Sequence, residues 1–544
     1  MSFIPLIFLT LTLLFPSSIS QNFSAPAPVS PDHACNFTTD PSFCQSLLPS
    51  QSLSNFYGYA QYLINKSLQQ SATFSSLINE TIRDKAALTP RAAAALEDCL
   101  LLSELTTDFL VNSLSTLDSC DSTTLAEDQA DLVHTLMSGI ITNQRTCLDA
   151  LTQASFLQRG HKLYAPLMNG SQLYSVSLAM LTNSWPFKHK KAVDPGRKLL
   201  DDLRVGSDGA PHWVNRNIFH FAAGRRMALQ TVGSVVVAQD GSGNYRTISE
   251  AIAAAPANDG SKGYYVINVK AGVYREYVTI PTTMKYIMIV GDGIGKTIIT
   301  GNRNVVDGST TFNSATLAVL GQGFVAIGIT VRNTAGRTKG QAVAVRNGGD
   351  LSAFYRCSFE GYQDTLYALS LRQFYRDCDV YGTVDFIFGN AAAVFQNCNL
   401  YARLPNGNVN TVTAQGRSDP NQNTGTSFIN CNVLAAPELS GKSVITFLGR
   451  PWRQYSRVVF MKSNLGSLID PAGWSAWTGN FALDTLYYGE YDNRGPGSAT
   501  AGRVKWPGFH VMAANDAKRF TVSSFVQGGA WLPRTIVPFT AGLL

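Results

Sequence analysis

The 544-residue chain is poor in charge, and it has no hydrophobic run long enough to cross a membrane. Only 15% of its residues are Asp, Glu, Lys or Arg, whereas 45% are hydrophobic. This balance excludes a largely disordered chain or a coiled coil, because both classes carry more charge. The length exceeds that of one ordinary domain, so we expect several domains with separate hydrophobic cores.

Lys and Arg are also missing from the N-terminus, where they usually open a secretory signal. The apolar stretch of residues 3–15 is nevertheless followed by Ser17, Ser18 and Ser20, small residues of the kind a signal peptidase requires. We interpret residues 1–20 as a cleaved signal peptide, with a buried N-terminal segment as the alternative. Five Asn-X-Ser/Thr sequons agree with secretion and glycosylation, at Asn22, Asn36, Asn65, Asn79 and Asn169.

The nine cysteines include no Cys-X-X-Cys pair and no His at zinc-binding spacing, which argues against a zinc site. An oxidising compartment permits disulfides instead, and the odd number leaves at least one thiol unpaired. From spacing alone, Cys35 and Cys44 can close a short loop and Cys99 can join Cys147 across two helices. Cys120 is then left over.

Charge is distributed unevenly along the chain. Residues 21–185 carry 7 Lys and Arg against 14 Asp and Glu, residues 186–232 carry 9 against 4, and residues 233–544 carry 27 against 19. This pattern indicates either an electrostatic partnership within the chain or ordinary variation of surface charge. The basic C-terminal part favours an acidic substrate outside the cell, and nucleic acid is not expected as a partner of a secreted chain.

Residues 21–185 are predicted to form a bundle of helices. Apolar residues recur three and four positions apart in four segments, which predicts amphipathic helices. The segments are Leu53 to Ile82, Arg91 to Leu117, Thr124 to Phe156 and Ser171 to Leu181. Short polar connections favour antiparallel packing, and the region shows no catalytic or metal-binding constellation.

Residues 186–232 form a predicted linker that contains two basic motifs, Arg197-Lys198-Leu199-Leu200 and Arg225-Arg226-Met227. An exposed dibasic segment in a secretory chain is a candidate for proteolytic processing. A simple solvated connector is the alternative.

Residues 233–544 contain a repeat centred on Cys357, Cys378, Cys398 and Cys431, each preceded by an aromatic residue as in Phe354-Tyr-Arg-Cys357 and Phe374-Tyr-Arg-Asp-Cys378. The cysteines are 21, 20 and 33 residues apart, a period suited to one coil of a parallel β-helix. We therefore predict a multidomain protein in which an N-terminal all-α four-helix bundle is followed by an all-β right-handed parallel β-helix. An irregular β-sandwich is the alternative for the second part.

This repeat places two aspartates at equivalent positions on adjacent coils. Asp364 lies seven residues after Cys357, and Asp385 lies seven residues after Cys378. Neighbouring strands are about 4.8 Å apart, so the two carboxyl groups should lie close enough to drive their pKa values apart, which is typical of an acid–base or acid–nucleophile pair. The alternative is that both aspartates are ordinary turn residues.

Other polar residues recur in the same register. Gln341 and Gln363 are 22 residues apart, so both amides can donate to one substrate oxygen. Arg450 can orient an aspartate, and Trp452 can stack on a sugar ring. The alternatives are a glutamine ladder, a surface ion pair and a core aromatic residue.

Five ordered blocks across residues 233–540 resemble the signature of plant pectin methylesterases. These blocks are Gly272-Val-Tyr-Arg-Glu276, Gln341-Ala-Val-Ala-Val345, Gln363-Asp-Thr-Leu366, Asp385-Phe-Ile-Phe-Gly389 and Leu448-Gly-Arg-Pro-Trp452. The acidic helical region is similar to the pectin methylesterase inhibitor domain that such plant enzymes carry as a pro-region, a pattern shared with invertase inhibitors.

The resemblance implies a role for each residue. Asp385 would be the nucleophile, Asp364 the general acid and then base, and Arg450 the partner of Asp385. Gln341 and Gln363 would stabilise the oxyanion. The predicted substrate-binding residues are Thr311, Gln341, Arg450 and Trp452.

The implied reaction is hydrolysis of methyl esters of galacturonate in pectin, that is, methyl-esterified homogalacturonan, in the cell wall or apoplast. No metal or organic cofactor is called for, and no membrane partner is expected. The implied processing protease is subtilase-like. Its motif of two basic residues followed by Leu-Leu fits residues 197–200, whereas residues 225–228 depart from it.

Two alternative functions stay open on the sequence alone. Another pectin-acting β-helix, a polygalacturonase or pectate lyase, also uses paired aspartates, and a lyase would need calcium. A non-catalytic wall-binding or inhibitory protein is the other alternative. The domain boundaries that we predict are 1–20, 21–185, 186–232 and 233–544, and we expect residues 21–185 to be autoinhibitory.

Overall fold

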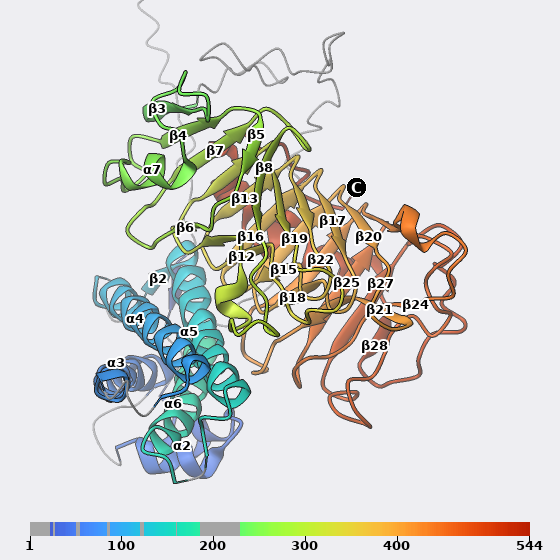
Figure 1. Ribbon diagram of the computed structural model, residues 1–544. Helices are drawn as coiled ribbons and strands as arrows, with labels where there is room; N and C mark the ends of the chain where they lie inside the picture. The colour runs from blue at the N-terminus through green and yellow to red at the C-terminus, as the bar shows by residue number, and fades with distance from the viewer. Residues whose placement is uncertain are drawn as a thin grey trace, which may run out of the picture.

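The computed structural model describes residues 22–24, 28–49, 55–83, 88–119, 124–158, 160–184 and 229–543. The predicted signal peptide, both basic motifs of the linker and Cys120 lie outside these residues. The described parts form a helical bundle packed against a parallel β-helix (Figure 1). The predicted fold class is therefore confirmed, and a β-sandwich is excluded.

Four long helices make the bundle, and each buries an apolar face of the kind that the sequence pattern predicts. They are α3 (Phe56–Arg83), α4 (Pro90–Asp118), α5 (Glu127–Gln153) and α6 (Tyr164–Ser184). Thr89 caps α4 because its side chain accepts a hydrogen bond from the amide of Ala92, and Pro90 occupies the first helical position. Helix α6 begins seven residues before its predicted start at Ser171. The additional stretch contains Pro166 and Gly170, two residue types that disfavour helices, so the sequence pattern did not indicate it.

Two disulfides hold the bundle together. Cys35 and Cys44 join the short helices α1 (Pro31–Cys35) and α2 (Pro41–Leu47), and Cys99 and Cys147 join α4 to α5. Both predicted pairings are confirmed. Strands β1 (Asn22–Ser24) and β2 (Thr124–Ala126) form a small antiparallel sheet beside the helices.

The β-helix consists of three parallel sheets whose strands recur once per coil. The 11-stranded sheet contains β3 (Thr231–Val237), β4 (Tyr264–Val269), β7 (Ile287–Gly291), β10 (Val325–Ile327), β13 (Ser352–Tyr355), β16 (Arg372–Arg376), β19 (Ala392–Gln396), β22 (Gly425–Ile429), β25 (Arg457–Met461), β27 (Tyr487–Tyr491) and β28 (Phe509–Val511). The 8-stranded sheet contains β5 (Gly272–Tyr274), β8 (Thr297–Gly301), β11 (Thr330–Asn333), β14 (Ser358–Glu360), β17 (Asp379–Gly382), β20 (Asn399–Ala402), β23 (Asn432–Ala435) and β26 (Asn464–Leu465). The 7-stranded sheet contains β6 (Val278–Ile280), β9 (Leu317–Val319), β12 (Val345–Asn347), β15 (Leu366–Ala368), β18 (Ile387–Gly389), β21 (Val409–Gln415) and β24 (Ile445–Gly449).

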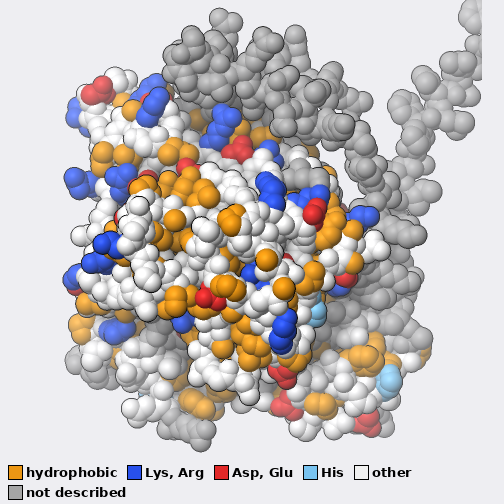
Figure 2. All heavy atoms as spheres, turned by 90° about the vertical axis from the view of Figure 1, so that its right-hand side faces the viewer, with side chains coloured by type: hydrophobic (Ala, Val, Ile, Leu, Met, Phe, Trp, Pro, Cys, Tyr) orange, Lys and Arg blue, Asp and Glu red, His pale blue; other side chains and the backbone are white. Residues whose placement is uncertain are grey.

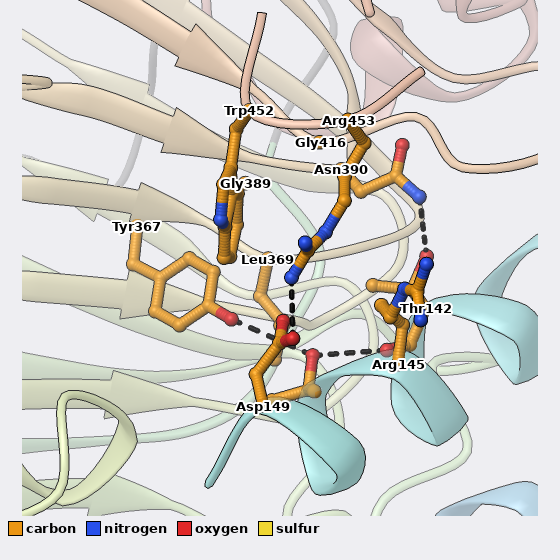
Figure 3. A pocket seen from close by; sticks show the side chains of 11 residues that line it. Thr142, Arg145, Asp149, Tyr367, Leu369, Gly389, Asn390, Gly416, Trp452 and Arg453 are labelled. Carbon is orange, nitrogen blue, oxygen red and sulfur yellow. Dashed lines mark hydrogen bonds and ion pairs between the residues drawn. The ribbon is translucent and has the colours of Figure 1, made fainter. Parts of the chain in front are cut away.

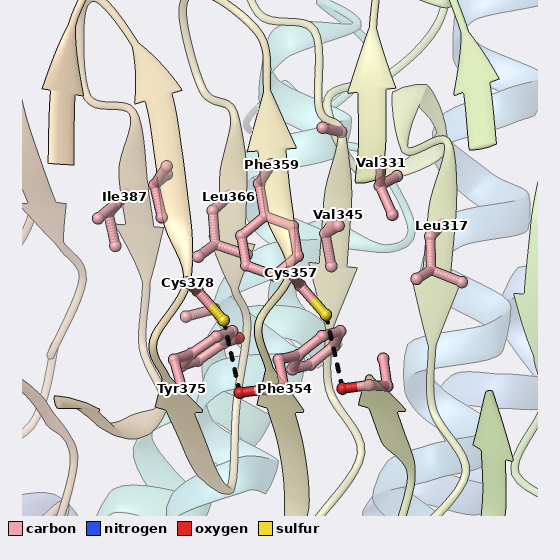
Figure 4. Close-up of a cluster of buried hydrophobic side chains, with 14 of the residues drawn as sticks. Leu317, Val331, Val345, Phe354, Cys357, Phe359, Leu366, Tyr375, Cys378 and Ile387 are labelled. Atoms are coloured by element: carbon pink, nitrogen blue, oxygen red, sulfur yellow. Dashed lines mark hydrogen bonds between the residues drawn. The ribbon is translucent and has the colours of Figure 1, made fainter. Parts of the chain in front are cut away.

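The core of the β-helix is a ladder of stacked side chains. Rings of Phe354, Tyr375, Phe395 and Phe428 lie on one another with centroids 5.1, 4.3 and 4.9 Å apart. The four repeat cysteines are buried free thiols beside this ladder, as Figure 4 shows for two of them. The cysteine spacing thus sets the register, and Tyr375, not the Phe374 of the sequence alignment, pairs with Phe354.

Short helices cover the N-terminal end of the β-helix and the outer face of its 11-stranded sheet. Helix α7 (Ile248–Ala253) covers the N-terminal end, where Thr247 and Glu250 form a capping box. After β28, helices α8 (Ala514–Ala517), α9 (Val522–Phe525) and α10 (Gly528–Trp531) contribute buried side chains to the outer face of the 11-stranded sheet. The remaining short elements are the 3-10 helices η2 (Phe312–Ser314), η3 (Pro437–Leu439), η4 (Lys518–Phe520) and η5 (Leu532–Arg534).

The bundle lies along one side of the β-helix, next to strands β12, β15 and β18 of the 7-stranded sheet (Figure 1). On the face turned away from this contact, Lys and Arg side chains are scattered among hydrophobic ones and do not gather into one patch (Figure 2). The 7-stranded sheet is therefore the surface that both parts of the chain share.

Phe395→Ala tests the importance of the aromatic ladder. Phe395 is fully buried between Tyr375 and Phe428, so its truncation should lower the free energy of unfolding by about 3–5 kcal/mol. Phe481→Ala is the matched control, because Phe481 is 39% exposed and should change the stability by less than about 1 kcal/mol. Denaturant titration of both variants measures the difference, and equal effects would contradict a core role for the ladder.

Candidate active site

The two aspartates lie side by side on adjacent coils of the 7-stranded sheet. Strands β15 and β18 pair in the register Leu366 with Ile387, so Asp364 and Asp385, each two residues earlier, occupy equivalent positions. The backbone φ angles are 61° and 52°, a left-handed conformation that an Asp side chain tolerates better than most. Both side chains line one cavity of about 240 Å³. The juxtaposition that the repeat predicts is therefore present.

Asp385 is held from two sides. Arg450 donates to it through two nitrogens, with Nε 2.8 Å from Oδ1 and Nη2 2.7 Å from Oδ2. The Thr411 hydroxyl donates to Oδ1 at 2.7 Å and accepts from the Asp385 amide at 2.8 Å. A bidentate guanidinium pair fixes both the charge and the orientation of a carboxylate.

Arg450 is itself positioned by an aromatic ring. Its guanidinium carbon lies 4.4 Å from the centroid of the Trp477 ring, a cation–π distance. Burial acts to lower the pKa of Arg450, but the hydrogen bonds and charge of Asp385 outweigh it and raise that pKa above its ordinary value. Arg450 is thus a permanent positive charge beside Asp385.

Asp364 has a different environment, although it lies one strand away. Burial raises the pKa of its carboxyl well above the ordinary value, the charge of Asp385 raises it further, and Arg450 opposes both effects. Asp364 therefore keeps its proton at a pH where an exposed Asp has lost it. The site combines a carboxylate paired with arginine and a neighbouring protonated carboxyl.

Gln341 and Gln363 both line the same cavity. Their coils are adjacent, because the Ala342 amide donates to the Gln363 carbonyl at 3.2 Å. The strand register pairs Val345 with Leu366, which are 21 residues apart. Gln341 and Gln363 are 22 residues apart, so they are displaced by one residue from this register. Both glutamines nevertheless line one cavity together with the two aspartates.

Thr311 and Trp452, the other two residues singled out in the sequence, also line the cavity. The Thr311 hydroxyl is buried and has no hydrogen-bond partner among the described residues. Trp452 lies edge-on to Phe388 with ring centroids 6.0 Å apart. A Cβ at Gly416 would approach the indole to 2.9 Å, so glycine leaves the room that this ring needs.

Several lining residues were not predicted. They are Thr310, Phe312, Tyr367, Phe388, Ala414 and Trp477 of the β-helix, together with the α5 residues Thr146, Asp149, Ala150 and Gln153. Thr411 was missed as well, although it occupies the next position in register after Asp385. The step from 385 to 411 is longer than the 21-residue step from 364 to 385, so the cysteine spacing gives no signal there.

Helix α5 forms one wall of the cavity, and polar contacts fix it to the β-helix. The Asn390 amide donates to the Thr142 hydroxyl at 2.9 Å, and the Gln422 amide donates to the Ser138 carbonyl at 2.8 Å. His134 Nε2 lies 2.8 Å from the Asn421 carbonyl. An ion pair between Asp149 and Arg453 completes this row along α5.

Helix α4 contributes a buried carboxyl to the same interface. The Thr310 hydroxyl donates to Asp98 Oδ2 at 2.5 Å, and burial raises the pKa of Asp98 to about 7. Burial lowers the pKa of His134 to about 4. The interface therefore contains ionisable groups that favour their neutral forms.

In the part of the chain that the structure describes, no group of three or more His, Cys, Asp and Glu side chains is arranged to hold a metal ion. A search of the same residues finds no helix with the length and apolar character needed to cross a membrane. Residues with carboxyl, amide, guanidinium and hydroxyl groups line the cavity.

A parallel β-helix does not by itself define a reaction, but a buried pair of aspartates, one of them bound by arginine, is typical of an acid–nucleophile pair in a hydrolase. Residues 234–529 match the Pectinesterase family, and residues 30–180 match the plant invertase/pectin methylesterase inhibitor family. The chain belongs to the pectinesterase family and carries an inhibitor domain at its N-terminus.

Individual relatives agree with this assignment. The chain is 48% identical to "Probable pectinesterase/pectinesterase inhibitor 20" of Arabidopsis thaliana, in an alignment that covers 98% of both chains. It is 51% identical to "Pectinesterase 2" of Citrus sinensis, with 83% of this chain and 82% of that one covered. The solved structure of a pectin methylesterase from carrot is 57% identical, covers 57% of this chain and 98% of its own, and has a TM-score of 0.56. The pectinesterase class replaces the alternatives of a polygalacturonase, a pectate lyase or a non-catalytic protein.

Asp98→Asn tests the buried carboxyl at the interface. Because the folded-state pKa of Asp98 lies above the unfolded one, the chain should lose stability as the pH rises from about 4 to about 7, and no more above that. The Asn variant lacks this loss, so its melting temperature relative to wild type should be unchanged near pH 4 and higher by a few °C at pH 8.

Thermal scans of both proteins at each pH measure this difference. The opposing titration of His134 is common to both and cancels. Asp108→Asn, at an exposed position of the same helix, is the matched control and should behave like wild type throughout. A pH-independent difference for Asp98→Asn would contradict the raised pKa.

Proposed function

We propose that the chain hydrolyses the C6 methyl esters of galacturonate units in pectin and releases methanol. One observation carries this proposal: Asp385, held by Arg450, shares a cavity with Asp364, whose pKa is raised. Ester hydrolysis through a covalent intermediate needs one carboxylate as nucleophile and one carboxyl as acid. The pair with Arg450 orients Asp385 as the nucleophile, and burial, which raises the pKa of Asp364, favours its acid form.

In the first step, an oxygen of Asp385 attacks the ester carbonyl carbon. The carbonyl oxygen becomes negative, and the side-chain amides of Gln341 and Gln363 donate hydrogen bonds to it. The bond from carbon to the methoxy oxygen then breaks, and Asp364 gives its proton to that oxygen. Methanol leaves, and an anhydride joins the galacturonate carbonyl to Asp385.

In the second step, water replaces Asp385. Asp364, now a carboxylate, takes a proton from a water molecule, whose oxygen attacks the galacturonate carbonyl. The bond to Asp385 breaks, and its carboxylate returns to the pair with Arg450. The free galacturonate acid is released, and Asp364 carries a proton for the next cycle.

Substrate binding uses the polar and aromatic walls of the cavity. Trp452 offers an indole face to a sugar ring, and the Thr311 hydroxyl, which has no hydrogen-bond partner among the described residues, offers a hydrogen bond. We assign both residues, together with Gln341 and Arg450, to substrate binding. No cofactor takes part in the proposed reaction.

We place the enzyme in the cell wall, after secretion and removal of residues 1–20. The structure describes the side chains of four sequon asparagines, Asn36, Asn65, Asn79 and Asn169. All four are exposed, as glycosylation requires. The described cysteines of the bundle form disulfides, which fits an oxidising compartment.

Substitution of the two aspartates tests the chemistry. Asp385→Asn should lower methanol release from methylated pectin by more than about 10³-fold because the nucleophile is lost. Asp364→Asn should lower it by about 10²–10⁴-fold because proton transfer is lost. Methanol is measured by a coupled oxidase assay on residues 233–544.

Asp379→Asn is the matched control for this pair, because Asp379 lies on the 8-stranded sheet and bonds to Asn399. Its activity should stay within about twofold of wild type. If either active-site variant keeps wild-type activity, the assigned roles are wrong.

A second function, autoinhibition by the bundle, is supported by α5 itself. Thr146, Asp149, Ala150 and Gln153 of this helix wall the cavity in which the aspartates lie. A pectin chain cannot occupy the space that these side chains fill. We therefore propose that residues 21–185 keep the enzyme inactive until a protease, subtilase-like and acting at residues 197–200 or 225–228, separates the two parts.

Gly139→Leu tests autoinhibition in the intact chain. A Cβ at Gly139 of α5 would lie 2.8 Å from Cδ2 of Leu371 in the β-helix and 3.1 Å from Cε2 of Phe109 in α4, so a larger side chain should disrupt the packing of α5 against both. We expect the variant to release methanol at least about tenfold faster than the full-length wild type and to approach the rate of residues 233–544.

Ser76→Leu, on an exposed face of α3, is the control and should leave the full-length activity unchanged. Equal activity of the full-length chain and of residues 233–544 would contradict autoinhibition, whatever the effect of the substitution.

A further inference from the structure

The carboxylate of Asp385 accepts three hydrogen bonds, which are divided unequally between its two oxygens. Oδ1 accepts from Arg450 Nε at 2.8 Å and from the Thr411 hydroxyl at 2.7 Å. Oδ2 accepts from Arg450 Nη2 at 2.7 Å, and among the described residues no second donor contacts it. An ionised carboxylate has about four acceptor positions, two on each oxygen. The position that stays open is therefore on Oδ2.

The backbone fixes the direction of the Thr411 hydroxyl bond. The Asp385 amide lies 2.8 Å from Thr411 Oγ1, and an amide can only donate, so Oγ1 accepts this bond and points its own hydrogen at Oδ1. Thr411 is 2% exposed. Its amide donates to the Thr383 carbonyl at 3.2 Å, and its carbonyl accepts from the Phe386 amide at 3.3 Å. Backbone and side chain of Thr411 thus hold the segment that carries Asp385.

The neighbouring pair of Asp149 and Arg453 shows that a guanidinium alone does not produce this arrangement. Arg453 Nη2 donates to Asp149 Oδ1 in a small pocket beside the catalytic cavity (Figure 3). Among the described residues, Asp149 Oδ2 and Arg453 Nε are buried without a hydrogen-bond partner. No hydroxyl contacts this carboxylate there, whereas Thr411 contacts that of Asp385. The orientation of Asp385 therefore depends on Thr411 as well as on its arginine.

Attack through Oδ2 keeps both hydrogen bonds to Oδ1. When Oδ2 bonds to the ester carbonyl carbon and methanol leaves, Oδ2 becomes the bridging oxygen of the anhydride. Oδ1 becomes the carbonyl oxygen on the side of Asp385 and can still accept from Thr411 and Arg450. Attack through Oδ1 would instead use an oxygen that two donors already occupy, so one of those bonds would be lost.

The Thr411 bond changes strength during the reaction, because the charge of Asp385 changes. In the first step the carboxylate becomes a neutral anhydride, so the bond weakens and does not accelerate the attack. In the second step the bond between Oδ2 and the galacturonate carbon breaks, and its electron pair returns to the carboxylate. The bond from Thr411 then becomes charge-assisted again and stabilises Asp385 as the leaving group.

We propose that Thr411 is a positioning residue whose hydroxyl holds Oδ1 of Asp385, leaves Oδ2 for attack and speeds the release of Asp385 from the anhydride. The inference rests on the proposed function and assigns a residue to its second step. It predicts that loss of the hydroxyl slows this step more than the first.

Thr411→Val removes the hydroxyl and keeps the shape of the side chain. Methanol leaves in the first step, which kcat/KM reports, whereas a slower second step lowers kcat and KM together. On methylated pectin we expect kcat and KM to fall about tenfold, the effect of losing one hydrogen bond to a charged group, while kcat/KM changes by less than about threefold. Rapid-quench measurements should show a burst of methanol before the slower steady rate.

Two further variants separate this effect from damage to the fold. Thr411→Ser keeps the hydroxyl and should restore kcat and KM to within about threefold of wild type. Thr297→Val is the matched control on the 8-stranded sheet. The buried Thr297 hydroxyl also accepts from an amide, that of Asp292 at 2.9 Å, and donates to an oxygen, the Val269 carbonyl at 3.0 Å. Its loss should leave kcat and KM within about twofold of wild type.

All variants and wild type are assayed as full-length chains, so inhibition by the bundle enters each measurement alike and cancels in the comparison. Equal falls of kcat and kcat/KM without a burst would mean that Thr411 only supports the fold of the site, and the inference would be wrong. Wild-type kinetics in Thr411→Val would overturn it as well. If neither full-length wild type nor residues 233–544 released methanol from pectin, the proposed function itself would be overturned.

Discussion

The register between the neighbouring strands β15 and β18 determines how the candidate catalytic groups are arranged. The pairing of Leu366 with Ile387 puts Asp364 and Asp385 at one level of the β-helix, where two carboxyl groups share a buried cavity. Arg450 binds Asp385 alone, so the two carboxyl groups are not equivalent. A shift of one residue between these coils would turn one side chain into the core and abolish the pair.

The same sheet serves both parts of the chain. Its outer face carries the proposed catalytic groups, and it is also the surface against which α4 and α5 pack. A catalytic cleft exposes polar and aromatic groups. The bundle that covers the candidate cleft therefore contacts the β-helix through buried hydroxyl, amide and carboxyl groups, such as those of Asp98 and Asp149. The proposed inhibition and the proposed substrate binding thus involve one cavity, which residues of α5 and of the β-helix line together.

Sequence reasoning reached far where the repeat is regular. Cysteines 21 residues apart predicted the β-helix and the meeting of Asp364 with Asp385, and apolar spacing predicted the four long helices. It missed Thr411 because the coil that contains this residue is longer than the preceding one. It also aligned Phe374 with Phe354, because two consecutive aromatic residues, Phe374 and Tyr375, could each take that position. The contact between α5 and the cavity was out of reach, because docking of two domains depends on surface shape, which no local pattern encodes.

The central claim is that Asp364 keeps a proton beside the carboxylate of Asp385. Infrared difference spectroscopy between wild type and Asp364→Asn tests it most directly. The spectra are recorded at about pH 6, which is about two units above the ordinary pKa of Asp. A protonated carboxyl band that is present in wild type and missing from the variant is the predicted result. A spectrum in which Asp364 contributes only an ionised carboxylate at that pH would contradict the claim.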